Sequence, residues 1–157
     1  RQTFLSMENL VRQWLPWLDD DRTIVDTENY IKGSSERVSK NEGIDFLIWY
    51  NNQLVGGIGV SPLDISHKKA SIGYWLAEEF QGKGIMTDSL KIVIEYLFKK
   101  MRLNRIEICC AVGNTQSSAL PKKIGFTYEG TSRESEWLYN HFVDIEVYSL
   151  LAKEWKN

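Results

Sequence analysis

Residues 81–86, Gln81-Gly82-Lys83-Gly84-Ile85-Met86, stand between the end of one predicted strand and the start of one predicted helix. Glycine lets the backbone approach a ligand closely, and the first turn of a helix offers unpaired N–H groups at the positive end of its dipole. The stretch therefore predicts a diphosphate-binding turn, although two glycines before a helix also occur without a ligand. It lacks the Gly-Lys-Ser/Thr ending of a Walker A loop and the third glycine of the dinucleotide fingerprint, which disfavours ATP and NAD chemistry.

The helix after this turn has the clearest pattern in the chain. Its apolar residues recur at helical spacing and predict one buried face; they are Leu90, Val93, Ile94, Leu97, Phe98 and Met101. Before the turn, apolar and β-branched runs predict strands at Ile44–Tyr50, Leu54–Val60 and Ala70–Leu76. The polar pair Asn51-Asn52 makes the first two strands a predicted hairpin.

The remaining elements complete a mixed pattern. They are a helix beginning after Asp26 or Thr27, a strand at Arg105–Val112, a short helix at Gln116–Lys123, and two closing strands at Thr127–Trp137 and Phe142–Leu151. An antiparallel meander that leads into a strand–helix–strand crossover predicts an α/β (α+β) fold with a mixed, mostly antiparallel central sheet flanked by helices. Without an internal repeat or linker, residues 1–157 are expected to form a single domain.

Composition narrows the class of function. The 157 residues carry a formal net charge of -2 with no basic stripe, so we expect no nucleic-acid partner. No apolar run approaches the roughly 20 residues that span a bilayer, and no signal segment is evident, so we expect a cytoplasmic protein without a membrane partner. Cys109 and Cys110 are adjacent in a predicted strand and should point to opposite faces, which argues against a disulfide framework or a metal site.

A second motif follows the predicted strand at residues 105–112. Asn114 can cap the short helix after it, and Gly125 can end that helix in the left-handed conformation. Together with the turn at residues 81–86, this segment resembles the GNAT superfamily of N-acetyltransferases. The turn is similar to the Gln/Arg-x-x-Gly-x-Gly/Ala signature that binds the CoA pyrophosphate. Residues 114–126 are similar to the Asn-x-x-Ser/Ala … Gly-Phe element of the RimJ/RimL-like branch. Met86 stands where the general signature has a small final residue, and a methionine at that position resembles the same branch.

The resemblance extends over nearly the whole chain. Trp14–Leu18 looks like the aromatic segment of that branch, Ile72–Leu76 like its central strand and Asp144–Leu151 like its closing strand. Family members usually begin with a strand before the first helix, and this chain starts after it. We therefore expect a GNAT-like sheet whose first strand is missing, through truncation or rebuilding of that segment.

The resemblance implies transfer of an acetyl group from acetyl-CoA to an amine, by direct attack in a ternary complex. The strand that ends at Trp75-Leu76 would bind the pantetheine arm and polarise the thioester carbonyl through its backbone, and the turn would hold the pyrophosphate. The implied cofactor-binding residues are Trp75, Leu76, Gln81, Gly82, Lys83, Gly84, Ile85, Met86, Thr87, Asn114 and Ser117.

The resemblance also suggests two catalytic side chains. Ser117 would hydrogen-bond the departing thiolate or relay a proton to it, against the simpler role of a serine at a helix start. Glu136 would accept the proton of the amine, against the simpler role of a solvated surface carboxylate. Glu134 competes for that role, because period-2 alternation places it on the same strand face. Water is a third alternative, because an α-amine with a pKa of ~7.7–8 loses its proton readily.

The amine acceptor stays open at this stage. Trp14, Trp17 and Tyr139 are the candidates for the wall of the acceptor pocket, against the commoner role of core or interface aromatics. A protein N-terminal α-amine, of the ribosomal-protein type, is the first expectation, and a small amine such as a polyamine, an amino acid or an antibiotic is the second. A non-catalytic acyl-CoA-binding module is a third possibility. The aromatic composition and family habit suggest a homodimer.

Overall fold

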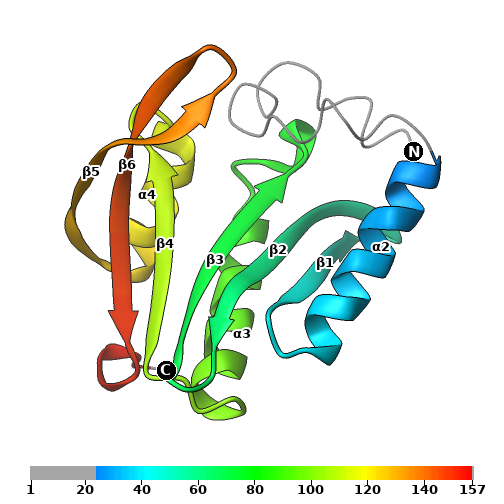
Figure 1. Cartoon of the computed structure of the whole chain (residues 1–157), viewed down its shortest axis with the longest axis horizontal. Coiled ribbons are helices and arrows are strands. Elements are labelled where there is room, and N and C mark those ends of the chain that lie inside the picture. The colour runs from blue at the N-terminus through cyan, green and yellow to red at the C-terminus, as the bar shows by residue number, and fades with distance from the viewer. Residues whose placement is uncertain (1–23, 157) are drawn as a thin grey trace.

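The central feature of the computed structural model, which describes residues 24–156 and their side chains from residue 32, is one six-stranded sheet in the order β1-β2-β3-β4-β6-β5 (Figure 1). Its main elements are α2 (Ile24–Ser39), β1 (Ile44–Tyr50), β2 (Gln53–Asp64), β3 (Lys69–Leu76), α3 (Ile85–Lys99), β4 (Arg105–Ala111), α4 (Thr115–Ile124), β5 (Thr127–Leu138) and β6 (His141–Leu151). Two short 3-10 turns, at Glu78–Phe80 and Ala152–Glu154, complete the described part.

The sheet is mixed, as predicted. Four of its strand pairs are antiparallel, and only β3 and β4 run parallel. Two predicted bounds were wrong. Strand β2 continues past Val60 to Asp64, because a register shift between Val60 and Leu63 accommodates Pro62, which has no N–H for a ladder. Helix α2 spans Ile24–Ser39, so Asp26 and Thr27, after which it was expected to begin, lie inside it.

Helices cover both faces of the sheet. In Figure 1, α3 lies behind β2 and β3, and α4 lies behind β4 and β6. Helix α2 contacts β1 on the other face, where Arg37 forms an ion pair with Asp45 at 2.6 Å. The predicted apolar face of α3 is buried over Leu90–Phe98, whereas Met101 lies beyond the helix and is only partly buried. Burial of this face against the central strands supplies most of the core.

The parallel pair is incomplete, and this positions the site. The ladder between β3 and β4 begins at Lys69 and Arg105 and ends at Ile72 and Ile108. Both strands continue beyond that point, to Leu76 and to Ala111. Figure 1 shows β3 and β4 close together near the C-terminus and separated at their other ends. One end of the sheet therefore has an interruption between its two central strands.

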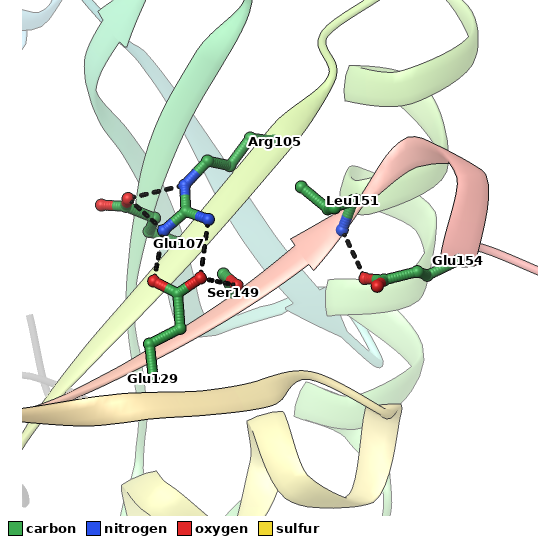
Figure 2. Close-up of polar contacts among 6 residues, drawn as sticks. All are labelled: Arg105, Glu107, Glu129, Ser149, Leu151 and Glu154. Carbon is green, nitrogen blue, oxygen red and sulfur yellow. Dashed lines mark hydrogen bonds and ion pairs between the residues drawn. The ribbon is translucent and has the colours of Figure 1, made fainter.

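The opposite end of β4 is held to its neighbours by charged side chains (Figure 2). The Arg105 guanidinium donates to both carboxylate oxygens of Glu129, at 2.8 and 2.6 Å, and to Glu107 at 2.8 Å. Ser149 donates to Glu129 at 2.7 Å. The hydrogen bonds and positive charge of Arg105 lower the pKa of Glu129 to about 2. The network joins β4, β5 and β6 at the end where the ladders are complete.

Within the described residues, no helix is both long and apolar enough to cross a membrane.

We predict that Glu129→Gln destabilises the fold in a pH-dependent way. The folded-state pKa of about 2 lies below the ordinary value of 4.5, so the stabilisation is fully present above pH 4.5 and is lost as the pH falls toward 2. Because the side chains are partly exposed, the loss at pH 7 should be only about 0.5–1 kcal/mol. Urea unfolding at pH 7 and at successively lower pH measures it. Glu134→Gln, an exposed carboxylate of the same strand, is the control, and an equal loss at every pH would contradict the assignment.

Candidate active site

A cavity of about 650 Å³ opens where β3 and β4 diverge. Four segments form most of its wall: the end of β3, the turn at residues 81–87, the end of β4 and the first turns of α4. Glu136 from β5 and Ile145 from β6 complete it. Segments far apart in the sequence therefore meet at the one interrupted pair of the sheet.

The cavity is lined from both faces of the sheet. Tyr74 and Cys110 alternate in phase with Ile72 and Ile108, whose buried side chains face α3 and α4. Cys109 has the opposite phase. Its partner along β6 is Val147, and Glu136 faces the same side as that residue because it pairs with Val143. Tyr74 and Cys110 from one face, and Cys109 and Glu136 from the other, all line one cavity. The opening therefore passes through the sheet.

The glycine turn has the geometry of an anion site. Gly82 and Gly84 have φ of 72° and 79°, in the left-handed region, and a Cβ at either position would meet no atom within 4 Å. The glycines thus satisfy the backbone and leave space for a ligand. Gly84 is the N-cap of α3, so the N–H groups of the first turn lack helical partners. Gln81 fixes the turn to the strand by donating to the Leu76 carbonyl at 3.0 Å.

Most predicted residues of this turn lie on the cavity wall: Gln81, Gly82, Gly84, Ile85, Met86 and Thr87, with Trp75 and Leu76 from β3. Lys83 does not. Its ammonium lies 5.2 Å from the centre of the Phe80 ring. The ladder between β3 and β4 ends at Ile72 and Ile108, so beyond that point the cavity, rather than β4, borders this edge of β3. A pyrophosphate joined to an extended, amide-containing pantetheine arm fits this combination of turn and strand edge.

Ser117 lies at the centre of a polar cluster on the other side of the cavity. Asn114 caps α4 by accepting from the Ser117 N–H at 3.2 Å. The Ser117 Oγ lies 3.5 Å from the Cys110 Sγ and 3.4 Å from the Tyr74 hydroxyl, and that hydroxyl donates to the Ser117 carbonyl at 2.7 Å. Burial raises the pKa of both Tyr74 and Cys110, so both keep their protons at neutral pH.

The structure separates the two candidate bases. Glu136 lies on the cavity wall. Glu134 is not among the described lining residues; it has φ of 49°, and its N–H donates to the Asp144 carboxylate at 2.7 Å. The regular alternation from which a shared strand face was predicted is interrupted, because the register shifts between Ser132 and Glu136.

The acceptor-wall candidates have different outcomes. Tyr139 is 47% exposed at the β5–β6 turn, with φ of 55°, and is not among the described residues that line the cavity. Trp14 and Trp17 lie outside the described residues. Tyr74 and Cys110 were missed as site residues. Strand periodicity predicts on which face of the sheet Tyr74 and Cys110 lie, but no pattern in the sequence indicated that α4 would place Ser117 against them.

Comparison with known families agrees with this arrangement. The model of the acetyltransferase (GNAT) domain matches residues 2–127. The chain belongs to the GNAT acetyltransferases. It is 44% identical over 114 residues to "Putative ribosomal N-acetyltransferase YdaF" of Bacillus subtilis (strain 168), a match that covers 73% of this chain and 62% of that protein. The chain therefore spans less than two thirds of that relative's length.

Two further GNAT proteins are similar over most of the chain. The ribosomal-protein-serine acetyltransferase of Escherichia coli (strain K12) is 30% identical over 148 residues, covering 94% of this chain and 83% of that protein. A solved structure of RimL, the ribosomal L7/L12 alpha-N-protein acetyltransferase in complex with coenzyme A, superposes with a TM-score of 0.90 at 28% identity, covering 96% of this chain and 85% of that one. The expected GNAT relationship and its RimJ/RimL-like character are thereby confirmed.

We predict that Gly84→Glu weakens acetyl-CoA binding at least tenfold, about 1.4 kcal/mol, because it places an anion in the open space of the turn. Gly125→Glu is the matched control: Gly125 is also left-handed, with φ of 104°, its Cβ would also meet nothing within 4 Å, and it does not line the cavity. Isothermal titration, with a melting curve for each variant, measures the difference. Equal weakening in both variants would contradict the assignment of this turn as the pyrophosphate site.

Proposed function

We propose that this chain transfers the acetyl group of acetyl-CoA to the N-terminal α-amine of a protein, of the ribosomal-protein type, in the cytoplasm. The observation that carries the proposal is that Ser117 and Glu136 line one cavity from opposite faces of the sheet. A donor from the α3–α4 side and an amine from the other side would meet in this opening. The names of the similar proteins, which refer to ribosomal proteins, support the acceptor class.

The chemistry is direct transfer in a ternary complex. The neutral amine attacks the thioester carbonyl, a C–N bond forms, and the tetrahedral intermediate then expels the thiolate as the C–S bond breaks. Glu136 accepts the proton that the amine loses. Backbone N–H groups of β3 beyond the end of the β3–β4 ladder stabilise the oxyanion, and the Ser117 hydroxyl donates to the thiolate, which is finally protonated to the thiol.

Features of the cysteines support direct transfer over an acyl-cysteine intermediate. Burial raises the pKa of Cys109 and of Cys110, so both are poor nucleophiles at neutral pH. No histidine is among the described residues that line the cavity. His67 contacts Asp64 at 2.8 Å in an exposed turn, and His141 contacts Asn140 at 2.9 Å in another. A cysteine mechanism would therefore lack a histidine among the described lining residues to activate the thiol.

The single carboxylate suits an α-amine. The pKa of an α-amino group is ~7.7–8, whereas that of a lysine-type amine is ~10.4, so far more of the α-amine is neutral at pH 7. One carboxylate with access to solvent is sufficient to remove the remaining proton during attack. A polyamine would ordinarily need a further acidic group for its second ammonium, and Glu136 is the one acidic residue among the described residues that line the cavity.

We predict that Ser117→Ala and Glu136→Gln each lower kcat by about 10²–10³-fold, while the affinity for acetyl-CoA changes less than about threefold. The reason is that both groups act on charge that develops during transfer rather than on the bound donor. Thiol release followed with a chromogenic disulfide measures kcat. Glu134→Gln, which alters a carboxylate outside the cavity wall, is the matched control and should be silent. Unchanged rates in both site variants would rule out these roles.

We predict that peptides with a free N-terminus are acetylated with a kcat/KM at least tenfold above that of spermidine or of free amino acids. The test is a panel of these amines with an N-terminally blocked peptide as the negative control. A preference for the polyamine would assign the chain to small-amine acetylation. Tight acetyl-CoA binding without turnover of any amine would instead indicate a non-catalytic binding module.

A further inference from the structure

Helix α4 contains a proline at a position that removes one of its main-chain hydrogen bonds. Pro121 lies inside the helix, four residues after Ser117. In a regular helix the N–H of residue 121 would donate to the Ser117 carbonyl, and proline has no N–H. Pro121 is less than 2% exposed, so its ring is part of the packed interior. The carbonyl of Ser117 is therefore left to find a donor outside the helix.

Tyr74 of β3 supplies that donor. Its hydroxyl donates to the Ser117 carbonyl at 2.7 Å, across 43 positions of sequence. The Ser117 N–H is held as well, because it donates to the Asn114 side chain at 3.2 Å. Both main-chain groups of Ser117 are thus bound by side chains rather than by the helix. The backbone of this residue is fixed at the cavity wall on two sides.

The side chain of Ser117 is held much more loosely than its backbone. Its Oγ lies 3.4 Å from the Tyr74 hydroxyl, which is long for two oxygens, and 3.5 Å from the Cys110 Sγ, and a thiol is a weak hydrogen-bond partner. The Tyr74 proton is already engaged by the carbonyl, so toward the serine hydroxyl Tyr74 acts as an acceptor. The backbone that carries this hydroxyl is fixed, whereas the hydroxyl itself can rotate toward a stronger acceptor, such as a thiolate.

We infer that Tyr74 is a positioning residue for Ser117, and that Pro121 makes this possible by leaving the Ser117 carbonyl free to accept from Tyr74. The inference rests on the proposed function, in which Ser117 donates to the departing thiolate. Tyr74 makes the main-chain contact, and Ser117 makes the contact with the reacting sulfur. Removing the tyrosine hydroxyl lets Ser117 drift and lowers the rate of transfer without removing any group that holds the donor.

The first arm of the test is Tyr74→Phe, which keeps the ring and deletes only the hydroxyl. We expect kcat to fall about 10- to 100-fold while the KM for acetyl-CoA stays within threefold, because misplacement of a reacting group costs rate rather than binding. Repeated in a Ser117→Ala background, Tyr74→Phe should change kcat less than twofold, because Tyr74 acts through Ser117. A similar loss of kcat in both backgrounds would overturn the inference in favour of a general structural role.

Tyr148→Phe is the matched control. Tyr148 is buried on β6, points to the same face of the sheet, and donates to Glu146 at 2.8 Å, but it does not line the cavity. The Tyr148→Phe variant therefore loses a partly buried hydrogen bond of a tyrosine hydroxyl, as Tyr74→Phe does. Its kcat should stay within twofold of the wild-type value. A tenfold loss of kcat in this control would show that any such deletion impairs the enzyme and would overturn the inference.

The second arm tests the proline independently of activity. Tyr74→Phe leaves the Ser117 carbonyl without its donor and should lower Tm by about 3–8 °C. Adding Pro121→Ala restores an N–H four residues after Ser117. The double variant should therefore recover at least half of the lost Tm, while its kcat stays low. No recovery of Tm would overturn the role given to Pro121.

The two arms keep the inference apart from the function on which it rests. A wild-type chain that binds acetyl-CoA but acetylates no amine would refute the proposed function, and the melting experiment would still report on the Tyr74–Ser117 bond. A wild-type chain that turns over a peptide, together with a Tyr74→Phe variant of undiminished kcat, would overturn the inference alone.

Discussion

The rest of the structure depends on the point where the parallel ladder between β3 and β4 stops. Hydrogen bonds join the strands only as far as Ile72 and Ile108, and the cavity occupies the space beyond. The strands can separate there because other contacts hold their opposite ends. The apolar face of α3 packs on the core, and Arg105 bridges to Glu129 of β5. An interruption of this kind brings a ligand site to a strand edge without exposing the whole core.

Two helix N-termini meet at this cavity. Gly84 caps α3 and Asn114 caps α4, and both residues lie on the wall. Each terminus presents the positive end of a helix dipole, although at α4 the Ser117 N–H is already capped by Asn114. In the reaction proposed above, a pyrophosphate with a permanent negative charge and a thiolate that forms during transfer would both lie here. The fold therefore offers electrostatic stabilisation for both without an arginine cluster.

Most of the fold was predictable because its signals are local. Helical spacing located α3, and alternating apolar runs located five of the strands within a few residues. The glycine turn and Asn114 were recognised because their chemistry depends on adjacent residues. Strand β2 was predicted too short, at Leu54–Val60, because the apolar run ends there, whereas a register shift lets the strand continue to Asp64. The expected homodimer remains a prediction.

By itself, the sequence determined the elements, the family resemblance and the two motifs that border the cavity. Only the tertiary structure decided which side chains meet there. Alternation along β5 predicted that Glu134 and Glu136 share one strand face. The register shifts between Ser132 and Glu136, and of these two carboxylates only Glu136 is among the described residues that line the wall. The contact between Tyr74 and Ser117 spans 43 positions and depends on how α4 packs against β3. The physical reason is that periodicity fixes the face on which a residue lies, whereas the packing of separate elements fixes what that face meets.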